Sequence, residues 1–523
     1  MKNGGPSSYN NVVFWVSSIT ILVIVILGAV SPENFAKYAS IFFDFTTIHF
    51  GWFYLISMAF FVAFCLFLAF SRYGRVKLGP DHEQPEYSFF SWISMLFAAG
   101  FGAGLVFWGV AEPMTHFASP PFKDVEPQTA EAARLAMRYS FFNWGIHQWS
   151  VFAVAGLALA YFQYRKHSNS LVSSTLTPLT GKPDRRVFKN SIDILAVIAT
   201  VIGVATSFGM AVLQINGGLK YVFSVPDRTW VQLVIIAVLF ALYITSAITG
   251  IDKGIKILSN INMGMCVALM LYVLFAGPTV FILNGFTLGI GDYIQHFIES
   301  SFYLTPYDGG TWVRDWTIFY WAWVIAWSPF VGAFVARISK GRTIREFVFG
   351  VLIVPPLIAM AWIAVFGGTA LHMDLFENAS IARAVSNDVT TALFVMLNEL
   401  PFDSVLSVFS LLLIAIFIVT SADSATFVLG MMTSNGNLNP SMIAKVIWGS
   451  LMAGISAVLI ISSGLKGLQT AALVSALPFT FILILMCISV LKALRRDSIM
   501  MDQQTENSKS ENKDVPVRKA KLS

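Results

Sequence analysis

Residues 316–332 read WTIFYWAWVIAWSPFVG, and this stretch decides how the rest of the chain is interpreted. It lies in an apolar run, residues 315–337, that is long enough to cross a bilayer. Four tryptophans fall within twelve residues, whereas an interfacial belt needs them only at the ends of a span. Trp323 and Trp327 are four residues apart and therefore share one helix face. Because Pro329 lacks a backbone donor and clashes with the preceding turn, we expect the helix to unwind there.

The composition around this stretch is that of a membrane protein. Of the 523 residues, 56% are apolar and 12% are charged, against roughly 25% charged residues in soluble chains. The mean hydropathy is +0.70. These values exclude a soluble enzyme, a disordered chain or a nucleic-acid-binding domain as the main body, so the net charge of +5 predicts no nucleic-acid partner.

Reading along the chain predicts an all-α polytopic membrane protein with twelve transmembrane helices. An amphipathic segment, residues 286–303, is expected to lie along the interface. The predicted spans are 12–30, 50–71, 88–111, 140–162, 191–215, 229–250, 258–284, 315–337, 346–371, 404–431, 443–463 and 469–491.

The distribution of Lys and Arg supports this count. If both termini are cytoplasmic, 25 of the 34 basic residues lie on the cytoplasmic side and nine on the other. That asymmetry is typical of a multi-pass protein of a cell's inner (plasma) membrane. Residues 1–11 then form a cytoplasmic N-terminus, and the polar segment 492–523 is predicted to be a disordered cytoplasmic tail.

A second interruption is predicted in the third span, where residues 98–104 read AAGFGAG. Gly100, Gly102 and Gly104 each weaken a helix by about 1 kcal/mol relative to Ala. They also let backbone amides and carbonyls turn toward a ligand. The alternative is close packing of helices through small residues.

The two predicted breaks lie five spans apart. Interrupted segments at corresponding positions of two halves indicate the binding site of an inverted-repeat transporter. Residues 88–285 (spans three to seven) and 315–491 (spans eight to twelve) would be the repeats. Residues 12–87 would then be two additional N-terminal spans.

Two further groups of side chains suggest ligands. Residues 141–152, FFNWGIHQWSVF, add aromatic faces that could enclose a cation together with those of span eight, although bundle packing is the alternative. Thr420 and Ser421 could supply oxygen ligands to sodium, or bond back to their own helix. Asp423 is an intramembrane acid, and so either a functional group or a helix cap.

These motifs closely resemble those of the betaine/choline/carnitine transporter family, and the resemblance covers about residues 10 to 495. The residues that carry it are 100–104, Glu112 with Pro113, 144–152, 316–347 and 420–424. The resemblance implies a secondary transporter of trimethylammonium and related solutes, with a five-plus-five inverted repeat (LeuT-like) and assembly as a homotrimer.

The resemblance also implies site residues, position by position. The aromatic site would comprise Trp144, Trp149, Phe152, Trp323 and Trp327, and the strip Gly100, Gly102, Gly104 would meet the carboxylate of the substrate. Sodium would be bound by the carbonyls of Ala98, Phe101 and Phe417 and the hydroxyls of Thr420 and Ser421. Thr200 and Phe330 match positions of a second sodium ion.

Some positions depart from the family pattern. Val324 stands where the family usually has Trp, which removes one wall of the substrate site and enlarges it. Phe152 replaces a Tyr, and Val204 replaces a Thr expected at the second sodium position. Choline-type members carry Asp at Gly104, so its absence favours a zwitterion.

The sequence therefore predicts a sodium symporter for a zwitterionic compatible solute, glycine betaine being the first guess. The alternative is proton-coupled or exchange transport of choline, carnitine, ectoine or a sulfonium zwitterion. Sodium is the expected coupling ion, and no cofactor is expected. A membrane enzyme would need a cluster of titratable residues within the membrane, and the sequence shows none. A channel would need a repeated pore loop or a ring of charges, and the sequence shows neither.

Overall fold

The computed structural model describes residues 12–100, 102–180, 186–249, 252–307 and 309–511, and this part of the chain is helical without a β-strand. The predicted segment 1–11, the predicted sodium ligand Phe101 and residues 512–523 lie outside it. The long helices are α1 Val12–Val30, α2 Pro32–Phe70, α3 Phe89–Gly100, α4 Ala103–Ala118, α5 Ala130–Asn143, α6 Ile146–Ala160, α9 Arg186–Phe223, α10 Thr229–Thr249, α11 Asp252–Ala276, α12 Thr279–Gln295, α15 Thr317–Ile338, α16 Ile344–His372, α19 Asp403–Met432 and α20 Met442–Glu511.

Short elements connect these helices. They are the 3-10 helices η2 Arg72–Arg75 and η5 Val389–Thr391, the π-helices η3 Tyr161–Arg165 and η4 Met373–Glu377, and the α-helices α7 Val172–Thr175, α8 Thr177–Thr180, α13 Phe297–Ser301, α14 Trp312–Asp315, α17 Ile381–Asn387 and α18 Ala392–Asn398.

Within the described residues, ten helices are long and apolar enough to cross a membrane. One outer face of α10 shows why the bundle needs lipid: Trp230, Val234, Val238 and Leu242, one turn apart, are each more than half exposed. The chain is therefore a multi-pass membrane protein.

The exact count of twelve spans stays a prediction, which two features support. α3 and α4 correspond together to the predicted third span, 88–111, but each is too short to be counted among the ten. α20 is counted once, although Gly464, at φ 57° and ψ −134°, divides it between the predicted spans 443–463 and 469–491.

The predicted break in the third span is present, since α3 ends at Gly100 and α4 begins at Ala103. The predicted unwinding at Pro329 is wrong, because α15 runs through it without interruption. The carbonyl that Pro329 leaves without an N–H donor is that of Ile325, and the Ser328 hydroxyl donates to it at 2.8 Å. The matching break that suggested two repeats is thus absent, and the inverted repeat stays a prediction.

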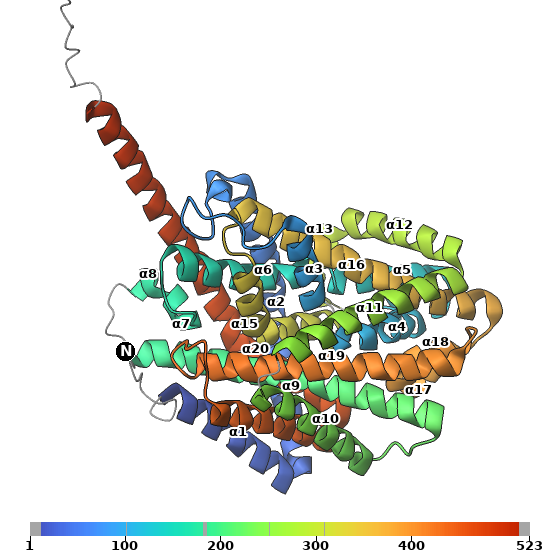
Figure 1. Ribbon diagram of the computed structural model, residues 1–523. Helices are drawn as coiled ribbons and strands as arrows, with labels where there is room; N and C mark the ends of the chain where they lie inside the picture. The colour runs from blue at the N-terminus through green and yellow to red at the C-terminus, as the bar shows by residue number, and fades with distance from the viewer. Residues whose placement is uncertain (1–11, 101, 181–185, 250–251, 308, 512–523) are drawn as a thin grey trace, which may run out of the picture.

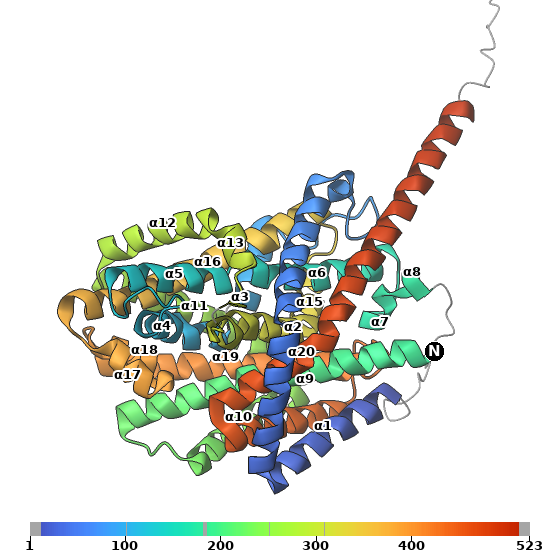
Figure 2. The same cartoon turned by 180° about the vertical axis from the view of Figure 1, so that it is seen from behind.

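Two predicted boundaries also change. α2 begins at Pro32, well before residue 50. The amphipathic helix is α12, which begins at Thr279 and lies on the outside of the bundle against α5 and α16 (Figures 1 and 2).

The predicted disordered tail is wrong for residues 492–511, which continue α20 beyond the bundle (Figure 1). A polar contact holds the start of this extension. Asp497 accepts a hydrogen bond from the Tyr161 hydroxyl at 2.6 Å and pairs with Lys166. The sequence analysis did not predict this contact, because the low apolar content of the tail indicated disorder.

α15 lies inside the bundle, packed against α6, α9 and α20 (Figure 2). Its residues from Thr317 to Ala326 are all buried. The tryptophan-rich stretch therefore faces other helices rather than lipid, beside the break between α3 and α4.

Candidate functional site

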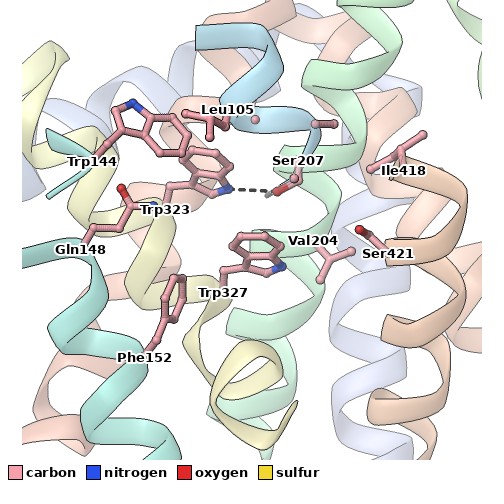
Figure 3. A pocket seen from close by; sticks show the side chains of 13 residues that line it. Leu105, Trp144, Gln148, Phe152, Val204, Ser207, Trp323, Trp327, Ile418 and Ser421 are labelled. Carbon is pink, nitrogen blue, oxygen red and sulfur yellow. Dashed lines mark hydrogen bonds between the residues drawn. The ribbon is translucent and has the colours of Figure 1, made fainter. Parts of the chain in front are cut away.

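A small cavity lies where α4, α6, α9, α15 and α19 meet (Figure 3). The volume open to the centre of a water-sized sphere is about 20 Å³, so the cavity can hold about one water molecule. A larger solute must therefore push the lining side chains apart. The lining residues are Gly102, Ala103, Gly104, Leu105, Trp144, Gln148, Phe152, Val204, Ser207, Trp323, Trp327, Ile418 and Ser421.

Aromatic rings form one wall of the cavity. Trp323 and Trp327 are nearly parallel, with centroids 6.1 Å apart and planes at 9°. Trp144 meets Trp323 edge-on at 6.1 Å, and Phe152 meets Trp327 edge-on at 6.0 Å. Ring faces attract a cation within about 6 Å of the centroid, so this wall suits a cationic head group.

Two hydrogen bonds fix the orientation of these indoles. The Trp323 Nε1 donates to the Ser207 hydroxyl at 3.1 Å (Figure 3). The Trp144 Nε1 donates to a carboxylate oxygen of Glu112 at 2.8 Å. The same carboxylate, completely buried, accepts from Asn143 at 2.8 Å, so Glu112 is a structural partner of the site and not a solvated residue.

The opposite wall is the break between α3 and α4. Gly102 is the N-cap of α4 without a side-chain hydrogen bond, and the first-turn residues Ala103 and Gly104 line the cavity. The first N–H groups of a helix lack intrahelical partners, and the positive end of the dipole lies there, which suits a carboxylate. The carboxyl end of α3 has the opposite polarity and suits a cation.

Gly104 also allows the two walls to approach. A Cβ atom at this position would lie 2.3 Å from the Trp323 Cη2, far inside normal contact. At Gly102 the nearest atom, the Trp327 Cη2, is 3.5 Å away.

Most of the predicted substrate residues line the cavity, but two that the structure describes do not. Trp149 packs edge-on against Phe152 at 5.3 Å, and Val324 is completely buried elsewhere on α15. The enlargement predicted from Val324 therefore does not follow from a place in the lining. Gly100 is the last residue of α3, and its role in the site stays a prediction.

The predicted sodium ligands are only partly brought together. Ser421 lines the cavity, whereas the Thr420 hydroxyl donates to the carbonyls of Ile416 and Phe417 at 2.9 and 3.0 Å. A hydroxyl that donates its hydrogen keeps lone pairs for a cation. Ala98 lies in the last turn of α3, where backbone carbonyls lack helical partners.

The second predicted sodium position lies near the crossing of α9 and α15. A Cβ at Gly203 would be 2.8 Å from the backbone N of Trp327. Thr200 and Phe330 each lie about one turn from this crossing. The Thr200 hydroxyl donates to the Ala196 carbonyl at 2.8 Å, and the Phe330 ring lies 6.2 Å from that of Trp327.

Sequence reasoning assigned no substrate role to several lining residues. The spacing of Trp144, Gln148 and Phe152 at four-residue intervals could have identified Gln148, because these residues share one helix face. Ser207 follows Thr206 in an apolar run and gave no comparable signal. Ala103, Leu105 and Ile418 are apolar and were not distinguishable from packing residues.

A cavity between a broken helix and a wall of rings, inside a bundle of membrane-crossing helices, defines a membrane transporter. Comparison with known families agrees: the model for the betaine/carnitine/choline family transporters matches residues 12–499. The chain belongs to this family, and it is a transporter and not an enzyme.

Individual relatives cover nearly the whole chain. An ectoine/hydroxyectoine transporter of Virgibacillus pantothenticus is 55% identical over 96% of this chain and 99% of its own length. A glycine betaine transporter, OpuD, of Bacillus subtilis is 46% identical over 96% of this chain and 97% of its own. An osmo-dependent choline transporter, BetT2, of Acinetobacter baylyi is 39% identical over 93% of this chain and 71% of its own.

Proposed function

We propose that this chain imports a zwitterionic compatible solute of the glycine betaine and ectoine type by sodium symport. One observation carries the proposal: the parallel rings of Trp323 and Trp327 and the amino end of α4 line the same cavity. A cation on the rings and a carboxylate on the helix end would be accommodated together.

The absence of charge in the lining supports a zwitterion over a cation. Among the described lining residues, none has an ionisable side chain that is charged at neutral pH. A desolvated solute with a net charge would have no counter-charge there, and burying an unpaired charge costs several kcal/mol. A zwitterion carries its own counter-charge. Each ring face that a desolvated cation meets can contribute about 2 kcal/mol.

The names of the relatives support the same class of solute. The 55% and 46% identical relatives are named for ectoine/hydroxyectoine and for glycine betaine. The choline-named relative is less similar, at 39% identity. Choline carries a net positive charge, which the uncharged lining disfavours.

Sodium is proposed as the coupling ion because oxygen atoms are available beside the break. These are the Ser421 hydroxyl, which lines the cavity, the hydroxyl of the adjacent Thr420, and the last-turn carbonyls of α3, which have no partners within their own helix. Coupling requires sodium and solute to favour the same occluded state. Sodium at the end of α3 would hold that end in place relative to α4, and thereby prepare the site for the carboxylate. Cytoplasmic termini and a homotrimer belong to the same proposal.

The sodium part is tested by replacing Thr420 and Ser421 together with Ala and measuring uptake against sodium concentration. We expect the concentration for half-maximal activation to rise at least tenfold. Ser424→Ala is the matched control, because the Ser424 hydroxyl is exposed and donates to the Thr420 carbonyl on the same helix. An unaltered sodium dependence in the double variant would exclude this site.

A further inference from the structure

Gln148 lines the cavity and has a buried hydrogen-bonding group without a partner among the described residues. It is 4% exposed, and its Oε1 atom has no hydrogen-bond partner among the described residues. Its side chain extends from α6 toward the Trp144 and Trp323 rings (Figure 3). A buried acceptor without a partner is costly, and such groups are uncommon in native structures unless a ligand or water completes them.

The other polar groups on this side of the cavity are already engaged. The Ser207 hydroxyl accepts from Trp323 and donates to the Gly203 carbonyl at 3.3 Å. The Trp144 Nε1 is bonded to Glu112. Among the described side chains beside the rings, the Gln148 Oε1 is therefore the acceptor that has no hydrogen bond of its own.

We propose that Gln148 is a specificity-determining residue that accepts a hydrogen bond from an N–H group on the cationic head of the solute. This inference rests on the proposed function and narrows its substrate class. It favours zwitterions whose cation is a planar, N–H-bearing amidinium over those with a trimethylammonium head.

The shape of the aromatic wall supports this choice. A planar delocalised cation can stack on the parallel faces of Trp323 and Trp327 and still direct its N–H groups sideways, as guanidinium groups do. The Gln148 amide lies to one side of these rings, where such a donor would point. A trimethylammonium group surrounds its charge with methyl groups and has no N–H to offer.

The unmet acceptor discriminates between the two kinds of head group. A trimethylammonium head leaves it without a partner, which is costly for a buried group, whereas an amidinium N–H supplies the missing hydrogen bond. One buried hydrogen bond of this kind corresponds to about tenfold in affinity.

The test is binding to the purified full-length protein in lipid nanodiscs with sodium present, measured by titration calorimetry. The probes are ectoine, a zwitterion with a cyclic amidinium, and glycine betaine, a trimethylammonium zwitterion. Gln148→Met keeps the length of the side chain and removes the amide. We expect it to weaken ectoine binding about tenfold and to change glycine betaine binding by less than about twofold.

Gln214→Met is the matched control. Gln214 is 1% exposed and its Oε1 also lacks a partner within the described chain, but it lies on α9 outside the lining and its Nε2 donates to the Val106 carbonyl. This variant should keep the wild-type ratio of the two affinities. Gln148→Glu retains an acceptor oxygen and should keep the preference for ectoine.

The outcomes separate this inference from the proposed function. If Gln148→Met weakens the binding of both solutes equally, or leaves the ratio of their two affinities unchanged, only the role of Gln148 is overturned. A wild-type protein that binds glycine betaine as tightly as ectoine would also overturn it, even if Gln148→Met does not fold. Binding of neither solute by the wild-type protein would overturn the proposed function and this inference together.

Discussion

Replacing Gly104 with Ala should damage solute binding without unfolding the protein. The added Cβ would lie 2.3 Å from the Trp323 Cη2 and 3.0 Å from its Cζ2, whereas carbon atoms in contact are about 3.5–4.0 Å apart. The ring must therefore withdraw by about 1.2 Å or more. It cannot do so freely, because its Nε1 is bonded to Ser207 and Phe319 stacks on it at 6.1 Å and 3°.

Overpacking of this kind costs about 1–3 kcal/mol, which corresponds to about a 5- to 150-fold loss of affinity if it displaces the cation-binding ring. Ala is also the better helix former, by about 1 kcal/mol, which offsets part of the cost to stability. The KM for uptake should therefore rise by that factor, while the melting temperature in detergent changes little.

Gly368→Ala is the matched control, because Gly368 lies on α16 outside the lining and a Cβ there would meet no atom within 4 Å. Its KM should stay within about twofold of wild type. The measurement is initial uptake rate against solute concentration at equal amounts of protein in the membrane. A Gly104→Ala variant with wild-type KM would refute the argument that this glycine seats Trp323.

Three further changes test other parts of the site. Trp327→Ala should abolish uptake while the protein remains folded and inserted in the membrane; unchanged uptake kinetics would exclude the proposed aromatic wall. Glu112→Gln leaves a single acceptor oxygen for the donors Asn143 and Trp144, which share the carboxylate. It should therefore loosen Trp144 and raise the KM about tenfold. A wild-type KM would show that this hydrogen bond does not position the Trp144 ring. Asp497→Asn should speed limited proteolysis of the end of α20 by weakening its contact with Tyr161, with the KM unchanged; equal cleavage rates would contradict the anchor.

The amino-acid sequence predicted those parts of the fold that depend on local composition. The bounds of α1 match the predicted 12–30, and α10, Thr229–Thr249, matches 229–250 within one residue. The break at Gly100 to Gly102 was visible because glycine weakens any helix. Pro329 misled the prediction because proline also weakens a helix, but here the Ser328 hydroxyl bonds the freed carbonyl. Whether a neighbouring hydroxyl turns inward depends on the packing around it.

The candidate site was predicted in part for similar reasons. Trp323 and Trp327 share a helix face by spacing alone, and the structure places both in the lining. The resemblance to a family added Trp149, although its spacing from Trp144 placed it on another side of a regular helix. The role inferred for Gln148 could not be derived from spacing. Its Oε1 is seen to lack a partner among the described residues only once α9 and α15 have been placed around it.

The most direct test of the account is uptake of radiolabelled solute by proteoliposomes under an inward sodium gradient, compared with potassium in its place. Ectoine and glycine betaine are supplied separately, each with and without excess choline. The account predicts uptake of a zwitterion only with sodium, and little competition by choline. Uptake that persists in potassium, or that follows a proton gradient instead, would contradict sodium symport, and strong competition by choline would contradict a site built for zwitterions.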